Sequence, residues 1–157
     1  MSEPDADGAA PAAAAARALG LQVTLTRHGR VHSLAEAAAA RGIEPRDIVK
    51  TMVVRRGPDD FVFVLVPGDS EIAWPKLRAL LGVSRLSMPD AATARAVTGY
   101  DRGTITPFGA TTAWPVIADE AIAGRRVSMG SGAHGVALAL DADAMLAALH
   151  ATVADIS

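Results

Sequence analysis

The chain has 157 residues, which is enough for one domain of ordinary size. Half of the residues are hydrophobic but only 4% are aromatic, so alanine and aliphatic side chains must fill the core. The absence of cysteine excludes disulfides, thiolate metal sites and a cysteine nucleophile, and it fits a reducing cytoplasm. The net charge of −2 excludes a protein that coats nucleic acid by bulk electrostatics, so a nucleic-acid partner would be held at a few points, such as one strand end.

The N-terminal segment, residues 1 to about 10, predicts a disordered tail. It lacks the basic and apolar regions of a signal peptide, and the chain has no run of 18 apolar residues, so we expect a soluble protein. Strong helix formers over 11–19 predict a helix that stops at Gly20. Alternation of apolar and polar residues over 21–26 then predicts a half-buried strand.

A helix and a β-hairpin are predicted next. Ser33 and Glu36 form a capping box, and Gly42 ends the helix that they begin. Two apolar strands follow at 48–54 and 61–66, separated by a short turn, which is typical of a hairpin.

The second half of the chain alternates helices, strands and glycine-rich segments. Pro75 and Pro89 predict the starts of two helices, which end near Gly82 and Val97. The remaining segments predict strands at 83–86, 116–118, 125–129 and 136–140, a loop over 98–110, and a last helix from Asp141 to about His150. We therefore predict a mixed α/β (α+β-like) single domain over residues 11–157, with a mixed or antiparallel central sheet flanked by helices.

Lys50 is unusual because it stands in a strand that is apolar on both faces. A lysine is rarely buried, since an unpaired ammonium loses its hydration. Lys50 could reach water from the start of the strand. Alternatively, it lies at the floor of a cleft and faces an anionic or carbonyl group.

Two glycine-rich segments are candidate substrate loops. The first, 98–109, could aim backbone N–H groups at a carbonyl oxygen, or it is an ordinary surface loop. The second, 130–135, could cradle a phosphate or a ribose, or it is only a tight turn; it matches neither the P-loop nor the dinucleotide pattern. The histidines have no metal-binding spacing and no G-x-S-x-G motif is present, so we predict no metal and no cofactor.

Three segments in this order resemble the YbaK/ProX family of aminoacyl-tRNA deacylases, which includes the editing domain inserted in bacterial prolyl-tRNA synthetases. They are Ile-Val-Lys-Thr-Met-Val-Val at 48–54, the G-x-x-x-P loop from Gly103 to Pro107, and Met-Gly-Ser-Gly-Ala-His-Gly at 129–135. The resemblance covers roughly residues 20–150, so the Ala-rich extension lies outside it. It implies a curved central sheet.

The resemblance also implies a function: a free-standing, cytoplasmic trans-editing hydrolase that cuts the ester of a mischarged tRNA. Cysteine or alanine on proline tRNA would be the typical substrate. The partner would be the tRNA acceptor end, with a synthetase as a further candidate and no DNA or membrane partner. Lys50 and Gly103 would be catalytic. The residues expected at the substrate are Thr51, Tyr100, Thr104, Ile105, Thr106, Pro107, Gly109, Gly130, Ser131, Gly132 and His134.

Two other functions remain open at this point. The chain could be a non-catalytic module that binds a tRNA end, a nucleotide or a synthetase. Turnover of an aminoacyl ester would distinguish an enzyme from such a module. It could also hydrolyse another small acyl ester or thioester, in which case uncharged tRNA would not compete.

Overall fold

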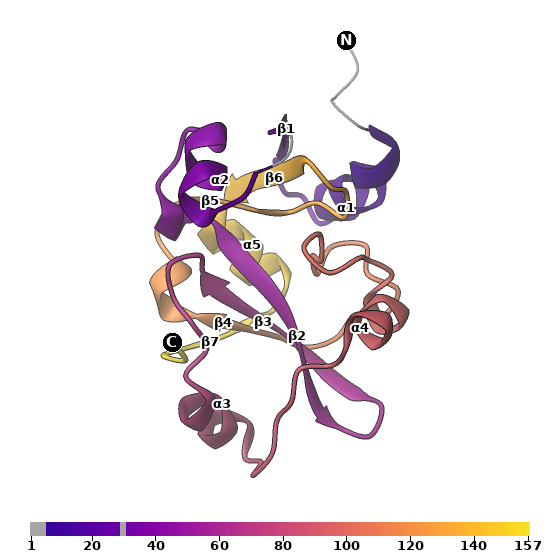
Figure 1. The fold of residues 1–157 in the computed structure, drawn as a ribbon, viewed down its shortest axis with the longest axis vertical. Coiled ribbons are helices and arrows are strands. Elements are labelled where there is room, and N and C mark those ends of the chain that lie inside the picture. The colour runs from indigo at the N-terminus through magenta and orange to yellow at the C-terminus, as the bar shows by residue number, and fades with distance from the viewer. Residues whose placement is uncertain (1–5, 29–30) are drawn as a thin grey trace.

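Two β-sheets form the framework of the molecule (Figure 1). The computed structural model describes residues 6–28 and 31–157. The larger sheet has the strand order β2-β3-β4-β7 and the smaller one the order β1-β6-β5. The strands are β1 (Thr24–Arg27), β2 (Val49–Gly57), β3 (Asp60–Pro67), β4 (Val116–Asp119), β5 (Arg126–Gly130), β6 (Val136–Asp141) and β7 (Thr152–Ala154).

The pairing pattern confirms the predicted mixed α/β class. The β2–β3 hairpin and both pairs of the smaller sheet are antiparallel, whereas β4 runs parallel to β3 and to β7. The central sheet is divided in two, and Ile48 links the parts by a parallel bridge to Ser128 of β5. The start of β2, which carries Lys50, therefore lies beside the smaller sheet.

Local sequence signals begin and end most of the helices. The helices are α1 (Ala6–Ala18), α2 (Leu34–Arg41), α3 (Trp74–Leu81), α4 (Ala91–Thr98) and α5 (Ala142–Ala148), and two single 3-10 turns lie at Pro45–Asp47 and Glu120–Ile122. The Oγ of Ser33 accepts a hydrogen bond from Glu36 N at 3.0 Å, and Gly42 ends α2 with φ +70°. Asp90 and Asp141 cap α4 and α5 through their carboxylates in the same way. None of the helices described is long and apolar enough to cross a membrane.

Strand β3 separates two parts of the core. Every residue from Phe61 to Pro67 is buried. Because side chains alternate along a strand, Phe63 and its neighbours on one face join the main core, while Val64 and its neighbours on the other face pack towards α3. A strand buried on both faces explains why its sequence is a continuous apolar run.

Several predicted boundaries are wrong. Residues 6–10, which were expected in a disordered tail, belong to α1; residues 1–5 of that tail lie outside the described part of the chain. The predicted strand at 83–86 does not form, since Val83 N still caps α3 and only Ser87 pairs with Arg55. Strand β7 was not predicted at all.

Candidate active site

A cavity of about 730 Å³ lies where the two sheets meet. Its walls come from the start of β2, from the loop between α4 and β4, and from the turn between β5 and β6. The end of α2 and the end of β1 complete it. The three segments that the sequence singled out therefore share one cavity.

Lys50 lines this cavity but is not deeply buried, with 31% of its side chain exposed. Its Nζ donates to the carbonyl oxygen of Ser70 and lies 3.5 Å from Oε1 of Glu71. Neither of these residues is part of the cavity wall. A lysine ammonium has three N–H donors, so one is left for a substrate.

Thr51 also lines the cavity, one position further along β2. Its Oγ1 is buried and has no hydrogen-bond partner within the described residues. Because an unpaired buried hydroxyl is costly, this oxygen is suited to bind a polar group of a substrate.

The loop between α4 and β4 is held in shape from inside. The hydroxyl of Tyr100 donates to Phe108 O at 2.6 Å and so spans the loop. Thr98 Oγ1 donates to Ala94 O and accepts from Tyr100 N. Burial raises the pKa of Tyr100. Tyr100 is thus a support for the loop and does not line the cavity.

Gly103 lies at the cavity edge of this loop with φ +93°. Thr104 turns back on the loop, because both its N–H and its Oγ1 donate to Asp101 O. The N–H groups of Gly103 and Ile105 donate no hydrogen bond to any described residue. These two N–H groups are therefore the candidates for binding a carbonyl oxygen.

The turn between β5 and β6 packs directly on this loop. A Cβ on Gly130 would lie 2.6 Å from Ile105 O, and a Cβ on Gly132 would lie 2.5 Å from the Tyr100 ring. Gly132 N donates to Thr104 O at 2.9 Å. Only glycine allows this approach, so both glycines set the distance between loop and turn.

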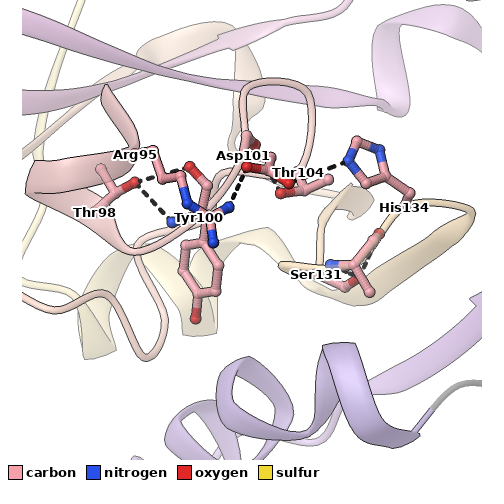
Figure 2. A network of polar contacts seen from close by, with 8 residues as sticks. Arg95, Thr98, Tyr100, Asp101, Thr104, Ser131 and His134 are labelled. Atoms are coloured by element: carbon pink, nitrogen blue, oxygen red, sulfur yellow. Dashed lines mark hydrogen bonds and ion pairs between the residues drawn. The ribbon is translucent and has the colours of Figure 1, made fainter. Parts of the chain in front are cut away.

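Polar side chains also stabilise the β5–β6 turn and the loop between α4 and β4 (Figure 2). Ser131 is buried, and its Oγ donates to Val136 O at 2.7 Å. Asp101 pairs with Arg95 and lies 3.6 Å from Nε2 of His134. Arg95, with a smaller effect of His134, holds the pKa of Asp101 below its ordinary value.

The predicted site residues fall into three groups. Those that line the cavity are Lys50, Thr51, Gly103, Ile105, Gly130 and His134. Those that support the loop and the turn from behind are Tyr100, Thr104, Thr106, Ser131 and Gly132. Pro107 and Gly109 instead line a second cavity of about 430 Å³ on another side of the loop.

Arg41, which no sequence motif identifies, also lines the main cavity, from the last turn of α2. Its Nη1 donates to Ser128 Oγ at 3.1 Å, and its Nη2 lies 3.4 Å from His28 Nε2. In sequence it looks like an ordinary basic residue at a helix end, which stabilises the helix dipole. Its position in the cavity wall could therefore not be predicted from the sequence pattern.

Comparisons with known proteins identify the family independently of the site geometry. Residues 28–148 match the family described as the aminoacyl-tRNA editing domain. A protein named as a Cys-tRNA(Pro)/Cys-tRNA(Cys) deacylase (EbsC) of Enterococcus faecalis is 30% identical over 128 residues, which are 80% of this chain and 78% of that protein. The proline–tRNA ligase of Thermosipho africanus is 38% identical over 80 residues, covering 51% of this chain and 14% of the ligase.

A solved structure extends the match to the N-terminal part of the chain. A crystal structure described as a trans-editing enzyme for prolyl tRNA synthetase superposes with a TM-score of 0.88 and 25% sequence identity, over 96% of this chain and 97% of that one. The sequence resemblance and the fold thus lead to the same result. The chain belongs to the aminoacyl-tRNA editing domain family.

Proposed function

We propose that this protein hydrolyses the ester bond of mischarged aminoacyl-tRNA. The observation that carries the proposal is that Lys50, the Gly103 loop and the Gly130 turn line one cavity. The family match and the deacylase name of the E. faecalis relative support the reaction class.

In the proposed reaction, water attacks the ester carbonyl carbon. The bond from that carbon to the ribose oxygen breaks, and the ribose oxygen takes up a proton. The N–H groups of Gly103 and Ile105 bind the carbonyl oxygen as it gains negative charge. Lys50 uses its remaining donor to orient the ester and to stabilise the same charge.

We assign removal of the water proton to the substrate itself. The described residues that line the cavity include no aspartate or glutamate. Their two histidines already have partners: His28 Nε2 lies 3.4 Å from Arg41 Nη2, and His134 Nε2 lies 3.6 Å from Asp101 Oδ2.

The proposed substrate is tRNA for proline that carries cysteine or alanine, and the proposed site of action is the cytoplasm. The names of the E. faecalis relative and of the trans-editing structure support proline tRNA. A separate editing pocket, in addition to the amino-acid site of the synthetase, is useful for such substrates. A methylene-sized difference gives the synthetase site only about 1–3 kcal/mol of discrimination.

Turnover on a panel of esters tests the proposal. Purified protein should hydrolyse Cys-tRNA(Pro) or Ala-tRNA(Pro) and leave Pro-tRNA(Pro) intact, and uncharged tRNA should compete. Tight binding of these tRNAs without any turnover would show a binding module instead. Hydrolysis that uncharged tRNA does not inhibit would show an esterase for small molecules.

A further inference from the structure

We propose that Arg41 binds a backbone phosphate at the acceptor end of the tRNA and so positions the ester over Lys50 and Gly103. This inference rests on the proposed function, because it assigns a part of the same cavity to the nucleic-acid portion of the substrate. It concerns a residue that neither the motifs nor the loop chemistry identify.

The guanidinium of Arg41 lacks the counter-charge that ion-paired basic residues elsewhere in the fold possess. Arg125 pairs with Asp47, and Arg56 pairs with Asp60. No carboxylate of residues 6–28 or 31–157 lies within ion-pair distance of Arg41. Burial lowers the pKa of Arg41, which means that the positive charge has lost part of its hydration.

The contacts of Arg41 leave donors available. The partner of Nη1 is the neutral hydroxyl of Ser128. The partner of Nη2 is His28 Nε2, whose role as donor or acceptor depends on the imidazole tautomer. The Nε atom is buried and has no partner in the described part of the chain. Since a guanidinium has five N–H donors in a planar fork, the remaining ones match the paired oxygens of a phosphate.

Packing holds the guanidinium at the cavity. Arg41 is the last residue of α2, and Gly42 ends the helix there in the left-handed conformation. Ser128 is buried in β5, where it forms the bridge to Ile48 that joins the two sheets. The hydrogen bond to this buried hydroxyl therefore holds the guanidinium at the cavity, and Arg41 does not extend freely into solvent.

Lys50 is less suited to the phosphate than Arg41. Its ammonium lies 3.5 Å from the carboxylate of Glu71, whereas no carboxylate of the described residues lies within ion-pair distance of Arg41. The cavity thus separates two tasks: Arg41 binds the anionic backbone, and Lys50 acts on the ester. The anion that fits is the phosphodiester on the 5′ side of the esterified ribose, which is the one nearest to the bond that is cut.

Two minimal esters that differ by one cytidine nucleotide, and therefore by one phosphodiester, test this assignment. Alanyl esters of adenosine and of the dinucleotide CpA are compared as substrates of the wild type and of Arg41→Gln and Arg41→Lys. The control is Arg46→Gln, which changes an exposed arginine that does not line the cavity. For the wild type and the control we expect a KM for the CpA ester that is lower by roughly tenfold, the effect of one charge-assisted contact. Arg41→Gln should remove this difference by raising the KM of the CpA ester and leaving that of the adenosine ester unchanged, and Arg41→Lys should restore part of the difference.

Binding of unesterified CpA and of adenosine gives a second readout that does not require turnover. Arg41→Gln should weaken CpA binding and leave adenosine binding unchanged, and it should reduce the slope of log K against log salt by about 0.7, the value for one single-strand phosphate contact. An equal effect of Arg41→Gln on both ligands, or no effect, would overturn the assignment, with folding checked by circular dichroism. Failure of the wild type to cut either ester would count against the proposed function, while the binding result would still decide the role of Arg41.

Discussion

Individual glycines set the geometry of the candidate site. Gly130 and Gly132 bring the β5–β6 turn so close to the 98–110 loop that a single methyl group would collide with backbone or with the Tyr100 ring. Gly103, in contrast, has open space around it and is needed for its positive φ. The same residue type therefore acts in two different physical ways in one cavity.

Gly130→Ala should reduce kcat at least tenfold, because its Cβ would lie 2.6 Å from Ile105 O and would push the proposed carbonyl-binding N–H groups away. Overpacking of this kind costs about 1–3 kcal/mol of stability. Gly57→Ala is the matched control, since its Cβ would meet only the Cβ of Asp60 at an ordinary 3.9 Å. Deacylation and thermal unfolding are measured for both; equal activity of the two variants would contradict this role of Gly130.

Asp101 links the loop to the turn through its charge, so its effect depends on pH. Arg95 lowers the pKa of Asp101 in the folded protein, so the pair between Asp101 and Arg95 exists above the ordinary value of 3.8 and is lost as the pH falls through the lowered value. Asp101→Asn should reproduce that loss at neutral pH and raise KM by roughly threefold, with little change in stability because the pairs are exposed. Asp59→Asn, on the β2–β3 turn, serves as control; identical KM values for the two variants would argue against the link.

At the scale of the elements, residue patterns predict most helices and strands where local signals are strong. The caps at Ser33 and Asp141 and the apolar β2–β3 hairpin lie where the sequence indicates, whereas α4 begins after its cap Asp90 and not at Pro89 as predicted. Strand β7 is three residues long and forms only by pairing with β4, so no local sequence pattern predicts it. Helix α1 starts earlier than expected because tertiary packing, not propensity, stabilises its first turns around Pro11.

Helix α1 presents a stripe of alanines to the core: Ala9, Ala12, Ala13 and Ala16 are all fully buried or nearly so. Ala12→Leu should therefore destabilise the protein by about 1–3 kcal/mol through overpacking. Ala14→Leu, on the exposed side of the same helix, should leave the free energy of unfolding almost unchanged. Chemical denaturation compares the two; equal midpoints would mean that α1 does not pack as described.

Helix α1 also supports the loop from behind. A Cβ on Gly109 would lie 2.9 Å from Pro11 O, so the two backbones are in contact. The Ala-rich extension, which lies outside the sequence resemblance, is thus part of the fold. The structural match over 96% of the chain agrees with this.

For the whole molecule, the distribution of charge matters more than its total. The net charge is −2, yet Arg27, Arg41 and Lys50 line the main cavity and no described carboxylate does. Composition shows that bulk attraction to nucleic acid is weak, but it cannot show that cations from three separate elements, β1, α2 and β2, line one cavity. That gathering depends on the bridge between the two sheets, which only the tertiary structure reveals.

The salt dependence of binding follows from this distribution. The protein should contact only one to three phosphates, so the slope of log K against log salt for a tRNA acceptor end should lie between about −0.7 and −2. The measurement is KM or Kd at several NaCl concentrations. A slope of −4 or steeper would mean a wide nucleic-acid interface outside the cavity.

The central claim is that the cavity around Lys50 carries out hydrolysis, and single-turnover cleavage of Cys-tRNA(Pro) and Ala-tRNA(Pro) tests it most directly. The chain has one other lysine, Lys76, which is exposed and pairs with Asp155, so Lys76→Ala is a matched control for Lys50→Ala. We predict that Lys50→Ala lowers the cleavage rate by about 10²-fold or more, while Lys76→Ala cleaves like the wild type. A folded Lys50→Ala variant that cleaves both esters as fast as the wild type would contradict the claim.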